Sequence, residues 1–151
     1  MKKILVPIDG SEYSERALVK AKELAKAFDD SQVVLLNVMT MESTVANLRY
    51  ASIEAVLDWP ELMEESKDKS NKLLEASKKA FSDLSNQVET VMLNEPTGNI
   101  ARAISEYVDE NNPDIVVMGS NGMGSLKHRL YLGSVTNKVL HLITKPVLVV
   151  Q

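Results

Sequence analysis

The chain has 151 residues, of which 44% are hydrophobic and 25% charged, and this size and composition suit one folded domain. Its net charge is −4 with acidic and basic residues mixed along the chain, which argues against a nucleic-acid-binding face, and the absence of cysteine excludes disulfides and cysteine-bound metal sites. The opening MKKILVPIDG has too few apolar residues for a signal peptide, and no apolar run reaches the ~20 residues needed to cross a bilayer. We therefore expect a cytoplasmic protein that binds neither nucleic acid nor membrane.

The first half of the chain alternates compact apolar runs with helical patterns. Residues 2–8 predict a buried strand that ends at Asp9-Gly10, and residues 32–39 predict a second strand. Between them, Ser11 or Ser14 is the expected N-cap of a helix over residues 11–28. One stripe of that helix is apolar: Ala17, Leu18, Ala21, Leu24, Ala25 and Phe28. A longer helix is predicted over residues 60–84.

The second half repeats the alternation. Residues 87–93 alternate enough to predict a strand nearer the edge of a sheet, and Thr97 is the expected cap of the next helix. Residues 114–119 predict the fourth strand, and residues 145–151 the fifth. The apolar faces of the last two helices are predicted to carry Ile100, Ala103, Ile104, Tyr107 and Val108, and then Val135, Val139, Leu142 and Ile143.

Strand and helix alternate five times, and most strands are apolar on both sides. Both features predict one α/β domain over residues 1–151, with a five-stranded parallel sheet and helices on both faces, as in Rossmann-like folds. Residues 40–59 fit this pattern less simply, because they mix polar residues with scattered apolar ones. An extra packed helix, a dimer surface and a lid over a ligand are the alternatives for that segment.

Residues 118–134, MGSNGMGSLKHRLYLGS, hold four of the six glycines and connect the fourth strand to the last helix. In an open parallel sheet, ligands bind outside the carboxyl ends of the strands. Glycine there allows positive φ and removes Cβ atoms, so that backbone N–H groups can converge on an anion at the following helix N-terminus. This reading predicts a phosphate-binding loop; a flexible surface loop with helix-capping glycines is the alternative. Ser125 stands where a P-loop needs lysine, and DGSEYS offers only one glycine for a dinucleotide fingerprint.

Four segments together, ILVPIDGSEYSERAL, MGSNG, LGS and KPVLVV, resemble the universal stress proteins across nearly the whole chain. The resemblance implies an adenine nucleotide alpha hydrolase-like sheet of strand order 3-2-1-4-5. The ATP-binding branch of that family carries a glycine, two residues, a glycine, nine residues, and then glycine with serine or threonine. Gly119, Gly122, Gly133 and Ser134 match this pattern, except that ten residues separate Gly122 from Gly133. The extra residue either forms a bulge in the loop or displaces the phosphate site.

The resemblance also implies a set of ligand contacts, with ATP and Mg²⁺ as the cofactor. Pro7, Ile8 and Asp9 would flank the adenosine, the backbone of Val38 would meet adenine, and Met118 would pack on the nucleoside. The residues expected around ribose and phosphates are Gly119, Ser120, Asn121, Gly122, Met123, Gly124, Ser125, Gly133, Ser134, Val135 and Thr136. No fixed metal site is expected.

Two of these assignments have alternatives. Asp9 either contacts ribose or Mg²⁺ or closes the turn into the first helix through an Asx-type hydrogen bond. Lys127, His128 and Arg129 either add positive charge near the phosphates or form a solvated polar cluster.

Catalytic signals are sparse, because the only histidines, His128 and His141, lack metal-pair spacing and no nucleophile triad is visible. We expect an ATP-binding, stress-response regulator with at most slow hydrolysis. The alternatives are a weak ATPase or phosphotransfer enzyme, and a nucleotide-free dimeric interaction module.

The apolar strand over residues 146–151 is expected at a sheet edge, where pairing with a second copy would cover it and form a homodimer.

Overall fold

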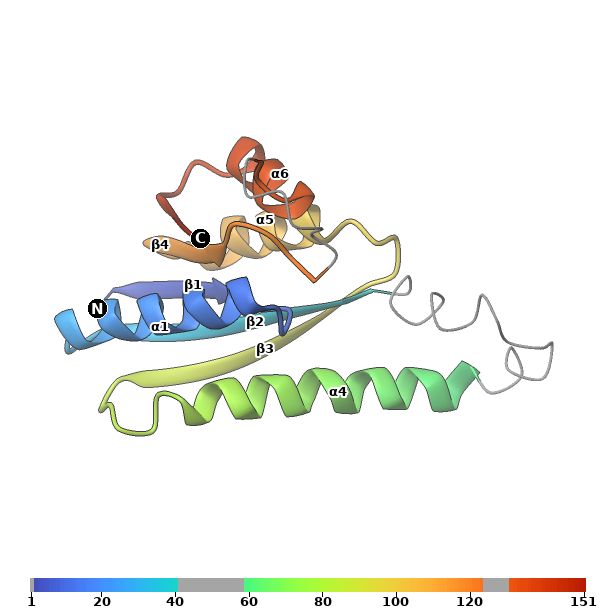
Figure 1. The fold of residues 1–151 in the computed structure, drawn as a ribbon, viewed down its shortest axis with the longest axis horizontal. Coiled ribbons are helices and arrows are strands. Elements are labelled where there is room, and N and C mark those ends of the chain that lie inside the picture. Colours follow the sequence, from blue (N-terminus) through green and yellow to red (C-terminus); the bar gives the residue numbers. More distant parts are fainter. Residues whose placement is uncertain (1, 41–58, 124–130) are drawn as a thin grey trace.

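The computed structural model describes residues 2–40, 59–123 and 131–151, in which strands and helices alternate as the sequence predicts (Figure 1). Thr40 ends a strand and Trp59 begins a helix, so residues 41–58, with the open question of a packed helix, dimer surface or lid, lie outside the described residues. The elements in chain order are β1 (Lys3–Pro7), α1 (Glu12–Ala27), β2 (Gln32–Thr40), α4 (Trp59–Lys79), β3 (Gln87–Glu95), α5 (Ile100–Asn111), β4 (Ile115–Gly119), α6 (Ser134–Leu142) and β5 (Val147–Val150).

The five strands form one parallel sheet in the order β3-β2-β1-β4-β5, which confirms the predicted fold class. Pro7 lies opposite Leu36 of β2, and Leu5 lies opposite Val116 of β4. The chain builds the sheet outward from β1 to β3 and then returns to add β4 and β5 on the other side of β1. The strand order therefore reverses between β1 and β4, where adjacent connections leave the carboxyl edge toward opposite faces.

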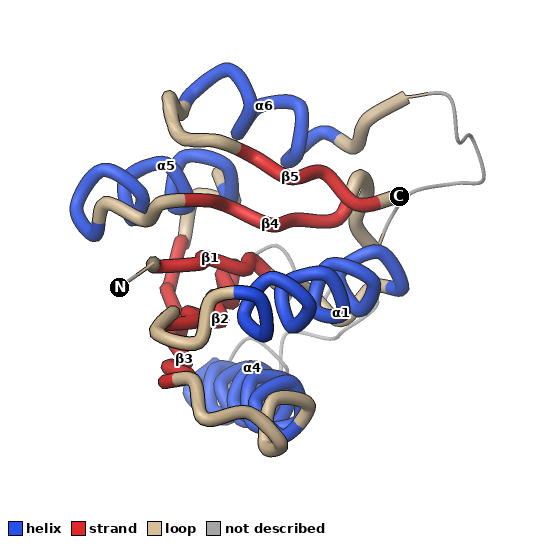
Figure 2. The backbone as a smooth tube through the Cα atoms, turned by 90° about the vertical axis from the view of Figure 1, so that its left-hand side faces the viewer, coloured by secondary structure: helices blue, strands red, loops and turns tan. Residues whose placement is uncertain are grey.

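Helices cover both faces of the sheet (Figure 2). On one face α1 and α4 pack against Ile4, Val6 and Val117, and on the other α5 and α6 pack against Leu5 and Val116. Alternate side chains of the central strands point to opposite faces, and both sets are buried, which explains why these strands are apolar throughout. None of the described helices combines the length and apolar character required to span a membrane.

The turn from β1 into α1 shows why this helix begins where it does. The backbone N–H of Ser14 donates to Oγ of Ser11 at 3.1 Å, so Ser11 is the N-cap, one of the two predicted candidates. The backbone N–H of Ser11 donates to Oδ1 of Asp9 at 2.9 Å, and Gly10 between them has φ of +79°. Asp9 thus forms the Asx-type turn, one of the two roles considered for it.

Four local predictions were wrong. Asn99, not Thr97, caps α5, because its Oδ1 accepts the backbone N–H of Arg102, whereas the Thr97 hydroxyl donates to the carboxylate of Glu95. The helix predicted to reach residue 84 ends at Lys79, where backbone bonds shorten to the i→i+3 type and turn the buried Phe81 into the core. Phe28 lies beyond the end of α1 and is 44% exposed, and Leu142 is 52% exposed at the end of α6, so neither belongs to a buried face.

Candidate functional site

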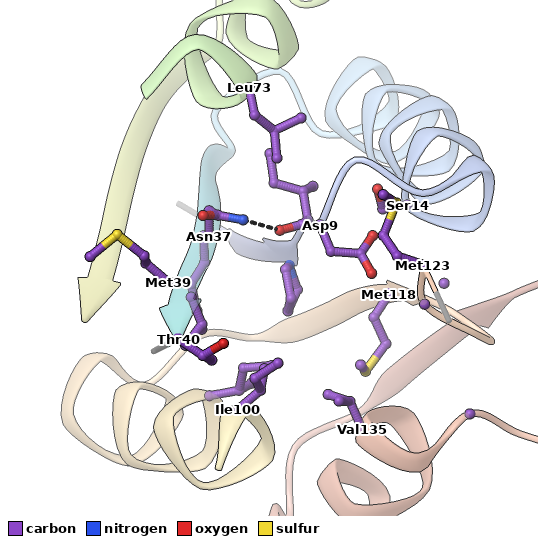
Figure 3. A pocket seen from close by; sticks show the side chains of 18 of the residues that line it. Asp9, Ser14, Asn37, Met39, Thr40, Leu73, Ile100, Met118, Met123 and Val135 are labelled. Atoms are coloured by element: carbon purple, nitrogen blue, oxygen red, sulfur yellow. Dashed lines mark hydrogen bonds between the residues drawn. The ribbon is translucent and has the colours of Figure 1, made fainter. Parts of the chain in front are cut away.

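A cavity of about 840 Å³ opens at the carboxyl edge of the sheet, across the point where the strand order reverses. The ends of β1, β2 and β4, the starts of α5 and α6 and the inner side of α4 surround it (Figure 3). Most residues that the sequence singled out line this cavity: Pro7, Ile8, Asp9, Val38, Met118, Gly119, Asn121, Gly122, Met123, Gly133, Ser134, Val135 and Thr136. Segments far apart in the chain therefore meet at one ligand-sized space.

Ser120 stands apart from these residues. Its hydroxyl donates to Oδ1 of Asn121, and it lines a smaller neighbouring cavity of about 490 Å³ together with Tyr131 and Gln151. The predicted contacts of Gly124 and Ser125, like the polar cluster at residues 127–129, lie outside the described residues.

The lining divides into an apolar and a polar part. Ile100, Met118 and Val135 converge from three elements on the side nearer α5 and α6 (Figure 3). Asp9 points toward the side of the cavity where Ser14 and Met123 lie (Figure 3), and its Oδ1 accepts a hydrogen bond from the N–H of Ser11. The other carboxylate oxygen, Oδ2, lies beside Gly122, since a Cβ added to that glycine would come within 2.9 Å of it. Asp9 is exposed and lines the cavity, so its oriented carboxylate is accessible to a ligand.

The three described glycines of the loop act differently from the prediction. Positive φ occurs at Gly10 and Gly98 among the described glycines, and not at Gly119, Gly122 or Gly133. An added Cβ would meet Tyr13 backbone atoms at Gly119 and the Asn121 Cα at Gly133. The missing side chains thus let segments of this protein approach one another, and the space beside Gly119 belongs to α1 rather than to a ligand.

The N-terminus of α6 lies at the cavity and carries no side-chain cap. Gly133 is the N-cap, and the first helical bond runs from the N–H of Asn137 to the carbonyl of Gly133. The backbone N–H groups of residues 134–136 therefore precede the helical ladder. Uncapped N–H groups and the helix dipole favour an anion at this position.

Hydrogen bonds tie both ends of the glycine loop together, so the longer spacing does not separate the predicted residues. The N–H of Gly133 donates to the Ser120 carbonyl at 2.8 Å, and the Thr136 hydroxyl donates to the Gly119 carbonyl at 2.8 Å. The side-chain amide of Asn121 donates to the carbonyl of Tyr131 at 3.3 Å. Gly119, Gly122, Gly133 and Ser134 all line the same cavity.

Sequence reasoning missed the side of the cavity formed by α4, and part of the lining from β2, α1 and α5. Additional lining residues come from β2 and α4, and from Ser14 and the start of α5: Ser14, Leu36, Asn37, Met39, Thr40, Ser66, Lys69, Ser70, Leu73, Ile100 and Ile104. Asn37 was detectable, because it is a single amide within the apolar run VVLLNVM. Its Nδ2 donates to the Ile8 carbonyl at 2.8 Å, and its Oδ1 accepts from the Ser70 hydroxyl at 2.6 Å.

Charges at the cavity are few. Among the described lining residues, Asp9 is the one anion and Lys69 the one cation. His141 is exposed on α6 and lies outside the lining, and the described part of the chain contains no group of three or more potential metal-ligating side chains. The groups with shifted pKa values lie elsewhere: burial raises the pKa of Tyr107, and the Lys3 backbone N–H lowers the pKa of Asp114.

An open, doubly wound parallel sheet with a ligand-sized cavity at its switch point is the arrangement of Rossmann-like α/β domains. The family model described as the universal stress protein family matches residues 1–151, and the chain belongs to that family. The resemblance inferred from the glycine loop and the flanking strands is thus confirmed at the level of the family.

Relatives of known name align over nearly the whole chain. The universal stress protein YxiE of Bacillus subtilis is 35% identical over 153 residues, covering 99% of this chain and 98% of YxiE. The universal stress protein MJ0577 of Methanocaldococcus jannaschii is 34% identical over 157 residues, covering 99% and 94%. The solved structure of MJ0577 matches with a TM-score of 0.80 and 31% identity, again over 99% and 94% of the two chains.

Two more distant solved structures contain adenine nucleotides. One is a universal stress protein in complex with cAMP (22% identity, TM-score 0.68, covering 99% and 97%). The other is a universal stress protein family member from Arabidopsis thaliana with AMP bound (18% identity, TM-score 0.65, covering 99% and 91%). At these identities the likeness to this chain shows the shared fold.

Proposed function

We propose that this chain belongs to the ATP-binding branch of its family, binds ATP with Mg²⁺ in the cavity, and acts as a nucleotide-dependent regulator with at most slow hydrolysis. One observation carries the proposal: a single cavity joins an apolar surface to the uncapped N-terminus of α6. That combination suits a ligand with an aromatic base at one end and phosphates at the other. The cAMP- and AMP-bound relatives support an adenine nucleotide as its class.

In this proposal each part of the lining has a role. The nucleoside packs on Ile100, Met118 and Val135, and adenine meets the backbone of Val38. The phosphates accept hydrogen bonds from the N–H groups at the start of α6. The carboxylate of Asp9 contacts ribose or Mg²⁺, and a bound Mg²⁺ neutralises part of the phosphate charge.

The same lining supports binding rather than rapid turnover. Among the described lining residues there is no histidine, and the single cation, Lys69, comes from α4. Fast phosphoryl transfer needs an oriented nucleophile and cationic stabilisation of the transferring group together. We therefore expect ATP to stay bound without hydrolysis for long enough that the ATP-bound protein is a distinct regulatory state.

The first test is calorimetry of MgATP binding to protein shown to be free of co-purified nucleotide. Ser134 allows a precise variant, because proline suits the first position of a helix and the extended Gly133 before it (φ −61°, ψ 157°) accommodates proline. Ser134→Pro deletes one N–H and the hydroxyl, and we expect it to weaken ATP binding about tenfold with an unchanged melting temperature. Ser134→Ala, the matched control, deletes the hydroxyl alone and has a smaller effect.

The outcomes separate the alternatives. No heat and no thermal stabilisation of the wild-type protein at millimolar ATP would refute nucleotide binding and favour the interaction module. Steady ATP turnover that Asp9→Ala abolishes without loss of binding would favour an ATPase or phosphotransfer enzyme instead.

The proposal includes a homodimer formed through residues 146–151. β5 is an edge strand of the sheet, and Leu148 is 37% exposed on it. The carbonyls of Pro146 and Val150 accept from the N–H groups of Val116 and Ser120, so by strand alternation the backbone groups of Val147 and Val149 point outward. An unpaired apolar edge of this kind is covered most simply by the same strand of a second copy, antiparallel about a two-fold axis.

Sedimentation velocity tests the dimer with a matched pair of variants. We expect Leu148→Lys to shift the protein to monomer, because two lysines would face one another across the paired strands. Val19→Lys introduces the same charge at an apolar position that is 58% exposed on α1, and should leave the dimer intact. A wild-type monomer at micromolar concentration, or equal behaviour of the two variants, would contradict the proposed interface.

A further inference from the structure

The inner side of α4 changes from apolar to polar where the helix passes the cavity. Ser66, Lys69, Ser70 and Leu73 line the cavity at helical positions i, i+3, i+4 and i+7, and so share one face of α4. Further along, Leu74 and the Phe81 that follows the helix are buried in the core between α4 and the sheet. A helix that only packed on the sheet would continue its apolar stripe through these positions. The interruption indicates that this stretch of α4 faces something polar.

A buried chain of hydrogen bonds holds this stretch of α4 against the ends of β1 and β2, beside the cavity. The Ser70 hydroxyl donates to Asn37 of β2 at 2.6 Å, and Asn37 donates to the Ile8 carbonyl of β1 at 2.8 Å. Ser70 and Asn37 are 6% and 9% exposed, so this chain is shielded from water. Lys69 immediately precedes Ser70, so the hydrogen bonds of Ser70 and Asn37 also fix the position of the Lys69 backbone.

Lys69 provides a positive charge for which the described part of the chain offers no ion-pair partner. It has no ion pair among the described residues, whereas Lys67 lies 3.5 Å from Glu64 and Lys22 lies 2.6 Å from Asp83. Its side chain is exposed at the cavity, so its charge is hydrated and available to a ligand. An ammonium group placed this way can form a charge-assisted hydrogen bond to a phosphate oxygen without paying for burial in the free protein.

We propose that α4 forms the second wall of the nucleotide site and that the Lys69 ammonium group pairs with a phosphate of the bound nucleotide. This inference rests on the proposed function and deepens it, because it assigns part of the phosphate recognition to an element on the opposite face of the sheet from α6. The ligand is then held from both sides of the switch point: by backbone N–H groups on one side and by a side-chain cation on the other.

Calorimetry with MgATP and with adenosine tests the pairing. Lys69→Met keeps the length of the side chain and removes the charge, and we expect about fivefold weaker ATP binding with adenosine affinity unchanged. Lys69→Arg keeps the charge and should retain most of the affinity. Lys72→Met is the matched control, because Lys72 is exposed on the same helix and does not line the cavity. The wild-type affinity for ATP should also fall more steeply with added salt than that of Lys69→Met.

The outcomes identify which statement fails. Equal ATP affinities for Lys69→Met and Lys72→Met would overturn the role of Lys69 while leaving nucleotide binding in place. An equal loss for adenosine and ATP would also overturn it, because the effect would then come from packing rather than charge. A wild-type protein that binds neither ligand would overturn the proposed function and this inference with it.

Discussion

Gly119 offers the sharpest test of how this fold is held together. It is the last residue of β4, and the first turn of α1 lies directly over it. A Cβ built on Gly119 would lie 2.7 Å from both the carbonyl carbon and the Cβ of Tyr13, and 2.8 Å from its carbonyl oxygen. Two of these three atoms are backbone, so no rotation of a side chain relieves the clash in Gly119→Ala.

The size of the effect follows from the distance that α1 must move. Ordinary contacts begin near 3.4 Å, so α1 must withdraw from β4 by about 0.7 Å. Ala17 and Ala21 of α1 are fully buried, and a gap of that size forfeits a quarter to a half of the dispersion energy of each affected contact. We expect Gly119→Ala to lower the free energy of unfolding by about 2–3 kcal/mol, in the range of other overpacking substitutions.

Urea unfolding followed by circular dichroism measures this loss without nucleotide. The transition midpoint should fall by about 1 M with an unchanged slope. Gly10→Ala is the comparison: φ is +79° there, but a Cβ would have ordinary 3.7 Å contacts with Leu73, so only backbone strain of about 1 kcal/mol is expected. A Gly119→Ala protein as stable as Gly10→Ala or more so would refute the packing argument, and would return Gly119 to the role of clearing space for a ligand.

Three further substitutions probe single contacts. Asn86→Ala removes the amide whose Nδ2 bonds the carbonyls of Ala25 and Phe28 at the end of α1, so chemical denaturation should show a loss of about 1–2 kcal/mol, with Asn71→Ala on the exposed side of α4 neutral. Thr136→Val should lower stability by about 1 kcal/mol in the same assay, because it removes the 2.8 Å bond to Gly119. The Lys3 backbone N–H, and then Lys2 and Lys145, lower the pKa of Asp114. That carboxylate therefore stabilises the fold above its ordinary pKa near 4 and loses this contribution as the pH falls through the lowered value. Asp114→Asn should be less stable than wild type at pH 7, and denaturation curves should converge toward pH 2; a constant difference would contradict the assignment.

Most of the fold could be predicted from local patterns. Apolar runs such as ILVPI and VVLLNV have strand length and no polar face, and the stripes between them have helical spacing, so an α/β sheet buried on both faces was the simplest arrangement. The errors fell at element ends. Thr97 and Asn99 are both good caps two residues apart, and the choice depends on which side chain the turn around Gly98 directs at an N–H of α5.

The candidate site divides in the same way. Residues directly after β1 and β4 were predicted, because the carboxyl ends of parallel strands meet at one edge whatever the details of packing. The α4 wall was not predicted. Ser66, Lys69 and Ser70 follow Asn37 by about thirty residues in the sequence, and only the packing of α4 across the sheet edge brings them to the site.

By itself, then, the sequence determined the order of elements, the two buried faces of the sheet and the edge at which a ligand site would form, because hydrophobic periodicity and chain order are local properties. Only the tertiary structure decided what the described glycines of the loop face and that α4 lines the cavity. It also decided that a ten-residue spacing still brings Gly122 and Gly133 to the same cavity. These features depend on distances between segments that are far apart in the chain. Tertiary packing sets such distances, and a local sequence pattern does not contain them.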